Sequence, residues 1–129
     1  MKRRGMLNHQ LAGIIAAMGH TDMVVVADAG LPVPPGVATV ELAVVAGMPP
    51  VADGARRHRR RTPGGSADGR RGSARPRSGD AVQARFSAAT LTRLPHETFK
   101  QRMAHARAVV RTGACTPYAN VILHAGVTF

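Results

Sequence analysis

The stretch GHTDMVVVADAGLPVPPG, residues 19–36, decides the fold. Its centre, MVVVA at residues 23–27, is a continuous, mainly β-branched run, which is typical of a strand covered on both faces in a parallel sheet. The strand must end at Asp28, because three prolines and two glycines impose an irregular loop on the chain that follows. Ligands of open α/β sheets bind beyond the carboxyl ends of the strands. Asp28 is therefore the first candidate site residue.

The segments around this strand predict two helices and further strands. Apolar residues at helical spacing predict a first helix, capped by Asn8 and stopped by Gly19: Leu11, Ile14, Ile15 and Met18. A second helix is predicted over residues 95–106, with Phe99 and Met103 four residues apart. Apolar stretches predict the remaining strands at residues 37–47, 86–94, 107–113 and 120–129. This order predicts one layered α/β domain over residues 1–129, built on a mainly parallel sheet.

The positive charge of the chain is concentrated in one segment. The formal net charge is +11 over 129 residues, and residues 51–85 hold ten Arg against three Asp, which leaves a net charge of only +4 for the rest. Such a basic segment favours a nucleic-acid-binding arm as an alternative function. Aromatic residues for base stacking are not interleaved with the arginines, and no recognition module is present, so nucleic acid is the weaker interpretation.

Cysteine content and hydropathy predict a soluble cytoplasmic protein. Cys115 has no second cysteine to pair with, so no oxidising compartment is required, and we expect it to be a small buried thiol. Asn8, His9 and Gln10 stand between the basic residues near the N-terminus and the apolar stretch that follows, and that stretch is short, so we do not expect a secretory signal. No apolar run is long enough to span a bilayer. We therefore expect no membrane partner.

Several polar residues stand at the ends of the predicted elements. His20 follows the first helix, His96 opens the second, and Tyr118 and Asn120 come just before the last strand. Taken one by one, ordinary structural roles suffice for them: a cation at a helix end, a first-turn residue, or a partner for local backbone groups. No motif raises the other histidines, His9, His58, His105 and His124, above packing or solvated roles.

The motifs together resemble the ribose pyranase and fucose mutarotase family. The resemblance lies in GHTDMVVVADAGLPVPPG (19–36), HETFK (96–100), RTGACTPYANVILHAGVTF (111–129) and the opening MKRRGMLN. Members that act on fucose tend to carry His where this chain has Gly30, and Tyr-Gly-Asn where it has PYAN, so the ribose-acting type is favoured. The resemblance implies an α/β/α layered fold and a cytoplasmic homo-oligomer, a decamer in the ribose type.

The resemblance also implies an activity and a set of residues. The activity is interconversion of the pyranose and furanose forms of D-ribose without a cofactor or metal. His20 matches the proton donor, and the sugar-binding positions match Asp28, His96, Tyr118, Ala119 and Asn120. Ring opening needs a group that both gives and takes protons near neutral pH, which suits an imidazole, and such help is typically worth about 10²–10⁴-fold. Cys115 has no part in this chemistry.

Residues 51–85 depart from the family pattern. They show no apolar period and are rich in Arg, Gly, Ser and Pro, so we expect an irregular or disordered segment where the family has helix, strand and helix. We hypothesise that the segment is an out-of-frame reading of a GC-rich gene with two compensating frameshifts. A sheet that lacks an internal strand would be less stable, so we expect weak or no activity from the chain as it stands.

Overall fold

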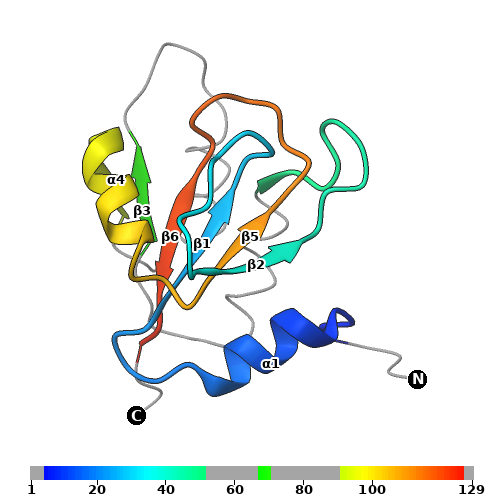
Figure 1. The fold of residues 1–129 in the computed structure, drawn as a ribbon, viewed down its shortest axis with the longest axis vertical. Helices are drawn as coiled ribbons and strands as arrows, with labels where there is room; N and C mark the ends of the chain where they lie inside the picture. The colour runs from blue at the N-terminus through cyan, green and yellow to red at the C-terminus, as the bar shows by residue number, and fades with distance from the viewer. Residues whose placement is uncertain (1–4, 52–66, 71–90, 127–129) are drawn as a thin grey trace.

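The computed structural model describes residues 5–51, 67–70 and 91–126. Two helices and six strands follow one another in these parts: α1 His9–Ala17, β1 Met23–Ala27, β2 Ala38–Glu41, β3 Ala67–Arg70, β4 Leu91–Leu94, α4 His96–Met103, β5 Ala108–Arg111 and β6 Val121–His124. Figure 1 shows the strands side by side, with α1 near the start of β1. Among the described helices, none is long and apolar enough to cross a membrane.

The strands form one sheet in the order β2-β5-β1-β6-β3-β4. β1 and β2 both pair with β5 in parallel, and β3 pairs with β4 in parallel. β6 is antiparallel to both of its neighbours, β1 and β3. Five of the six strands thus run in one direction, which confirms the predicted, mainly parallel sheet. The reversed direction of β6 was not predicted, and it decides where the site lies.

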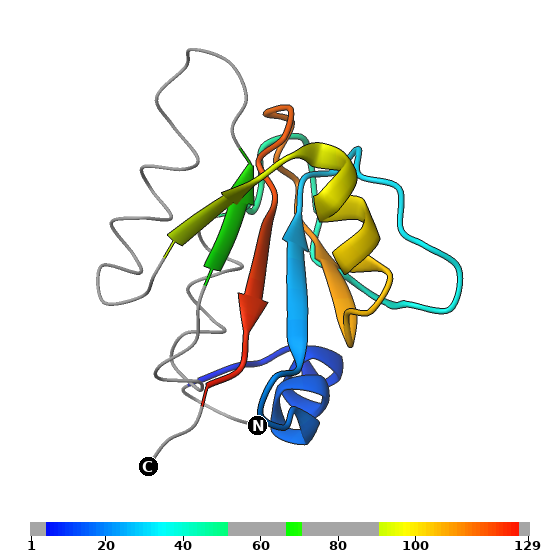
Figure 2. The same ribbon diagram turned by 90° about the vertical axis from the view of Figure 1, so that its left-hand side faces the viewer.

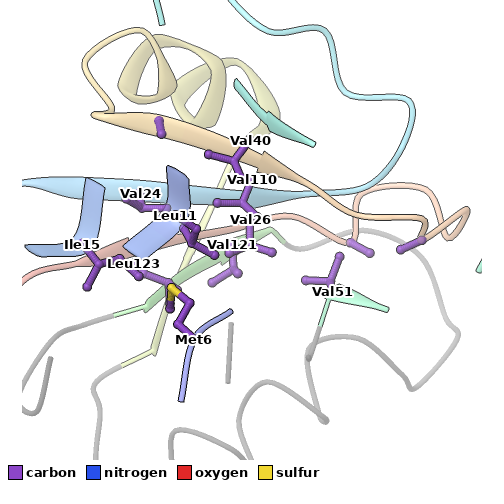
Figure 3. Packing of buried hydrophobic residues seen from close by; sticks show 13 residues of the cluster. Met6, Leu11, Ile15, Val24, Val26, Val40, Val51, Val110, Val121 and Leu123 are labelled. Atoms are coloured by element: carbon purple, nitrogen blue, oxygen red, sulfur yellow. The ribbon is translucent and has the colours of Figure 1, made fainter. Parts of the chain in front are cut away.

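One face of the sheet is covered by α1. Asn8 caps the helix as predicted, because its side-chain oxygen accepts from the backbone N–H of Leu11 at 2.8 Å. Leu11 and Ile15 are buried against the residues of β1, β2, β5 and β6 that point to this side (Figure 3). Ile14 and Met18 pack at the margin of the same cluster. The predicted apolar face of the helix is therefore the face that contacts the sheet.

The other face of the sheet is covered by α4 (Figure 2). Phe99 and Met103 are 1% exposed each and pack against the alternate residues of the strands, including Val25, Val109 and Ile122. Pro95 is the N-cap, so the helix begins one residue later than predicted, and it ends at Met103 instead of Ala106. With α1 on the opposite face, the described residues form the predicted α/β/α arrangement.

The second predicted strand, residues 37–47, is too long. β2 ends at Glu41, and the chain then turns back on itself, with a hydrogen bond from the Val44 N–H to the Met48 carbonyl at 3.1 Å. Val44 and Val45 continue the apolar pattern of the sequence but are 76% and 60% exposed. The pattern misled because these side chains lie in a loop beyond the end of the sheet. We call residues 43–49 the apolar hairpin.

Part of the basic central segment forms a strand. Residues 67–70 are β3, which lies between β6 and β4 and pairs with both. The expectation that these residues would be irregular is therefore wrong, and the sheet does not lack an internal strand. Backbone hydrogen bonding supplies this pairing without any apolar side-chain period. The predicted strand at residues 86–94 appears as β4, Leu91–Leu94, and the rest of both segments, apart from Val51, lies outside the described residues.

Candidate active site

Asp28 lies directly beyond the carboxyl end of β1, as predicted. Its side chain is buried, with 8% of the residue exposed, and one carboxylate oxygen accepts from the Gly30 N–H at 2.9 Å. This local hydrogen bond is an Asx turn, which starts the irregular loop that the sequence indicated. The backbone N–H of Asp28 donates to the side-chain oxygen of Asn120 at 2.8 Å. Neither hydrogen bond uses the second carboxylate oxygen, which is the atom that could accept from a ligand.

Asn120 reaches this position because β6 runs antiparallel to β1. Val26, near the end of β1, is paired with Val121, the first residue of β6. The start of β6 therefore lies beside the end of β1, and residues 92 positions apart in sequence come into contact. Asn120 is buried, at 7% exposed, and its oxygen is engaged by Asp28. Its amide N–H groups are the donors that it could direct at a ligand.

Thr112 is a residue of this edge that the sequence analysis missed. It follows β5 and is fully buried, and both its N–H and its hydroxyl donate to the Ala27 carbonyl, at 2.9 and 2.8 Å. The hydroxyl also accepts from the Ala114 N–H at 3.3 Å, and the Ala114 carbonyl accepts from the Ala29 N–H at 2.9 Å. Thr112 thus joins the ends of β1 and β5 beside Asp28. The available signal was a polar residue directly after the predicted strand residues AVVR, 108–111.

His96 and Tyr118 meet at the same edge. Their rings pack edge to face, with centroids 5.5 Å apart and planes at 70°. His96 is the first residue of α4 and follows β4, whose carboxyl end is at the same edge as that of β1. The Nδ1 atom of His96 is buried and has no hydrogen-bond partner among the described residues. Buried polar atoms usually have a partner, so this nitrogen is a candidate contact for a bound molecule.

The backbone of the PYAN stretch is unusual. Tyr118 has φ 63°, the left-handed conformation that non-glycine residues rarely adopt, and it is 46% exposed. Strained backbone of this kind is concentrated at functional sites. Ala119 donates its N–H to the Thr116 carbonyl at 3.2 Å, and its side chain is buried in the core. If Ala119 contacts a ligand, only its backbone is placed to do so.

His20 lies at the other end of the sheet. It is exposed and sits in the turn before β1, whereas Asp28 follows β1. Five extended residues separate the two ends, a span of about 13 Å between the first and last Cα of the strand. Figure 1 shows α1 and the start of β1 at one end and the loops after β1 and β5 at the other. The chain brings together Asp28, His96, Tyr118, Ala119 and Asn120, but not His20.

Cys115 corrects one prediction. It is a free thiol and is exposed, not buried, because it lies in the loop at the carboxyl edge. Its sulfur contacts the Gly113 carbonyl at 3.5 Å. Within the described parts of the chain, no three His, Cys, Asp or Glu side chains lie close enough to hold a metal ion. Besides this thiol, the predicted site residues at this edge offer a ligand a carboxylate, an amide, an imidazole and a phenol.

The comparison with family models identifies the class of protein to which this fold and edge belong. The model of the RbsD / FucU transport protein family matches residues 1–128. The chain belongs to this family, and the resemblance inferred from its motifs is confirmed.

Individual relatives match over their whole length. The D-ribose pyranases of Bacillus licheniformis and Paracidovorax citrulli are 43% and 47% identical to the chain, with both partners fully covered in each comparison. The solved structure of Bacillus subtilis RbsD complexed with D-ribose matches with a TM-score of 0.93 and 40% identity, again with full coverage of both chains. Fucose mutarotase from Streptococcus pneumoniae, in complex with L-fucose, has a TM-score of 0.84 and 24% identity, and it shares the fold.

Proposed function

We propose that the chain interconverts the pyranose and furanose forms of D-ribose by opening and reclosing the sugar ring, without a cofactor. The support comes from full-length relatives named D-ribose pyranase and from the ribose complex of the Bacillus subtilis protein. The observation that carries the proposal is the antiparallel pairing of β6 with β1. This pairing joins Asn120 to Asp28 and gathers polar groups at one edge of the sheet.

The edge residues suit the recognition of sugar hydroxyls. The carboxylate oxygens of Asp28 would accept hydrogen bonds from sugar hydroxyls, while the Asn120 amide would donate to their oxygens. Tyr118 has a hydroxyl that does both. The buried Nδ1 of His96, held against the Tyr118 ring, would complete the set. Ala119 would contribute through its backbone.

Ring opening requires two proton transfers. One proton goes to the ring oxygen and one leaves the anomeric hydroxyl, and reclosing through a different hydroxyl gives the other ring size. A group that titrates near neutral pH serves both steps, with a benefit of about 10²–10⁴-fold. We assign the proton delivery to His20. No covalent bond to the protein is needed.

His20 is too far from Asp28 to act on the same sugar within one chain, so the proposal includes a homo-oligomer. A second copy would present its His20 turn at the carboxyl edge of the first. The apolar hairpin, with Val44, Val45 and Met48 exposed, follows β2 at that edge and offers apolar surface for such a contact. Contacts between two different surfaces close into a ring where the rotation from copy to copy completes a circle, and such a ring agrees with the decamer that the resemblance implies.

Exchange NMR on D-ribose tests the activity. We expect weak or no acceleration of exchange between pyranose and furanose signals by the chain as it stands, and clear acceleration after the central segment is recoded in a frame that restores an amphipathic pattern. Sequencing the coding DNA across codons 45–90 decides whether such a frame exists. Spontaneous rates in the presence of the recoded, folded protein would contradict the assignment. Faster exchange of L-fucose than of D-ribose would assign a fucose mutarotase instead.

Mixing two inactive variants tests the shared site. His20→Ala removes the proton donor and Asp28→Asn damages the sugar pocket. If each site combines His20 of one copy with the pocket of another, random mixed rings regain activity at about one quarter of their sites. Absence of any recovery in verified mixed oligomers would show that the two residues do not cooperate across copies.

The alternative of a nucleic-acid-binding arm rests on residues 51–85, most of which lie outside the described parts of the chain. A salt-sensitive shift of a labelled oligonucleotide would support it. Protection of the protein by D-ribose against thermal unfolding would support the enzyme. We also infer action in the cytoplasm, which the single cysteine permits.

A further inference from the structure

The turn that carries His20 has an unusual backbone. Thr21, the next residue, has φ 74°, so a β-branched residue occupies the left-handed region that disfavours it. The same turn is closed by a hydrogen bond from the Asp22 N–H to the Gly19 carbonyl at 3.2 Å. Such a conformation persists only when its surroundings hold it in place. Something near His20 must therefore fix the turn.

Asp22 makes the contacts that fix it. One carboxylate oxygen, Oδ2, accepts from the Gly19 N–H at 2.8 Å and from the Arg107 Nε–H at 2.9 Å. The Asp22 carbonyl accepts from the Ala125 N–H at 2.8 Å, just beyond β6. Arg107 precedes β5, and its own N–H donates to the Met23 carbonyl at 2.9 Å. Asp22 thus ties both ends of the turn to the amino end of β1 and to its two neighbours.

We propose that Asp22 is the positioning residue for His20, with Arg107 holding its carboxylate across the sheet. The inference rests on the proposed function, because it assigns a purpose to the turn only if His20 delivers the proton. Asp22 does not itself touch the sugar. Its carboxylate fixes the direction in which the exposed imidazole projects toward a second copy.

The geometry favours positioning over stability. The Arg107 and Asp22 side chains are 59% and 25% exposed, and ion pairs this open to water add little to stability. A catalytic group displaced by about 1 Å loses about 100-fold in rate. Releasing the turn would let Thr21 relax to a common conformation and move His20 with it. The expected loss lies in turnover and not in folding.

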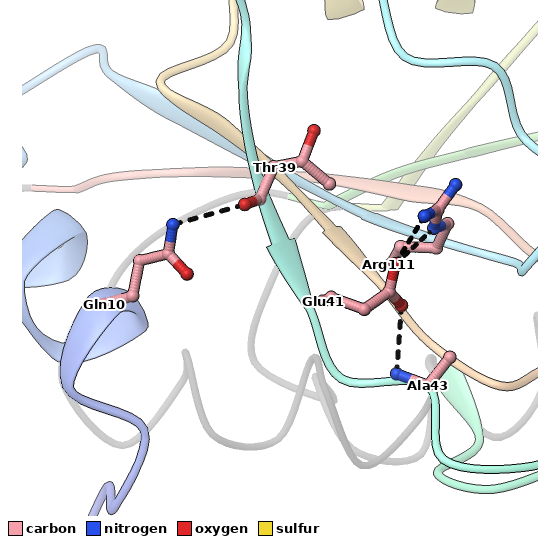
Figure 4. A network of polar contacts seen from close by, with 5 residues as sticks. All are labelled: Gln10, Thr39, Glu41, Ala43 and Arg111. Carbon is pink, nitrogen blue, oxygen red and sulfur yellow. Dashed lines mark hydrogen bonds and ion pairs between the residues drawn. The ribbon is translucent and has the colours of Figure 1, made fainter.

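Glu41 provides a matched control (Figure 4). Its carboxylate accepts one backbone N–H, from Ala43 at 3.1 Å, and one arginine Nε–H, from Arg111 at 2.7 Å. Glu41 therefore has the same kinds of partner as Asp22, one on each oxygen, but lies at the carboxyl end of β2, far from the His20 turn. Glu41→Gln and Asp22→Asn make the same chemical change. Asp22→Ala removes the acceptor altogether.

The experiment measures backbone order and activity in the full chain. In Asp22→Ala we expect the NMR order parameters of His20 and Thr21 to fall from about 0.85 to below about 0.6, and kcat for ribose exchange to fall about ten- to one-hundredfold with KM little changed. Asp22→Asn keeps an oxygen for the Gly19 N–H and should retain part of both. Glu41→Gln should leave the order parameters of the His20 turn unchanged.

The outcomes separate the two proposals. A rigid turn and unchanged kcat in Asp22→Ala would overturn the positioning role while leaving the ring interconversion standing. Equal losses in Glu41→Gln and Asp22→Asn would also overturn it, because they would indicate general destabilisation. Full activity in His20→Ala would contradict the assignment of His20 as the proton donor, which is part of the proposed function. A turn that loosens in Asp22→Ala supports the inference even where activity is too weak to measure.

Discussion

Two buried polar side chains organise the backbone at the edge where Asp28 lies. Asn120 accepts from the Asp28 N–H, and the Thr112 hydroxyl bridges the Ala27 carbonyl and the Ala114 N–H. Neither arrangement follows from residue type, because Asp28 lies 92 positions from Asn120 and Ala27 lies 85 positions from Thr112. Motifs pointed to His20 and Asp28, but β1 lies between them and places them at its opposite ends. At this scale the sequence indicated candidate residues but not the contacts between them.

Replacement of Thr112 tests the bridge. Thr112→Val keeps the shape but removes the hydroxyl, so the buried Ala114 N–H loses its acceptor. We expect a loss of about 1–3 kcal/mol in the free energy of unfolding and weaker ribose binding, measured by urea unfolding and titration. Thr112→Ser keeps the hydroxyl and should recover most of both. Equal effects of the two variants would contradict a role for the hydrogen bonds.

The direction of β6 is the decisive feature among the elements. Its pairing with β1 and β3 brings the PYAN stretch to the carboxyl edge, whereas a parallel β6 would carry it to the end where His20 lies. The loop after β5 also depends on a close approach: the Gly113 carbonyl accepts from the Gly47 N–H, and the Gly113 N–H donates to the Pro49 carbonyl at 3.1 Å. The apolar hairpin is held against the site loop by these backbone contacts.

Gly113→Ala tests that approach. A Cβ atom at this position would overlap the carbonyl oxygens of Val45 and Met48, which belong to backbone and cannot swing aside. We expect a loss of about 1–3 kcal/mol and a displaced apolar hairpin, seen as a lower thermal midpoint and a smaller oligomer. Gly13→Ala is the control, since nothing lies within 4 Å of its Cβ in α1 and alanine favours a helix. A Gly113→Ala protein as stable as Gly13→Ala would refute the close contact.

Acidic pH should weaken the molecule slightly at two solvent-exposed carboxylates. The Gly19 N–H and Arg107 lower the pKa of Asp22, and Arg111 and the Ala43 N–H lower the pKa of Glu41. A carboxylate with a lowered pKa in the folded state adds stability above its ordinary pKa, near 4, and loses it as the pH falls through the lowered value. Asp22 pairs with Arg107 just before β5, and Glu41 pairs with Arg111 at the end of β5. The two carboxylates therefore link opposite ends of β5 to other elements.

The measurement compares thermal midpoints at neutral pH and at about pH 3. We expect the midpoint to fall on acidification, and to fall less in an Asp22→Asn, Glu41→Gln double variant, because that protein has already lost both contributions. A Glu97→Gln variant serves as the control. Glu97 pairs with Lys100 on α4 and its side chain is 78% exposed, so its replacement should not change the fall in the midpoint. An identical fall in the double variant would assign the acid sensitivity to other groups.

The sequence by itself determined the elements and the identity of the edge residues. The period of the apolar residues gave α1, β1, α4 and β5 to within a few positions, because local burial leaves a local pattern. That pattern failed in two places. β3 formed through backbone pairing although its residues have no apolar period. Val44 and Val45 continue the apolar period of β2 but lie exposed to solvent in a loop.

Tertiary structure alone decided how the candidate site is assembled. The direction of β6, the bridge through Thr112 and the span of β1 between His20 and Asp28 are consequences of long-range hydrogen bonding across the sheet. A strand reads the same in sequence whether its partner is parallel or antiparallel, since its side chains alternate in either case. The edge on which Asn120 meets Asp28 was therefore fixed only when the strands paired.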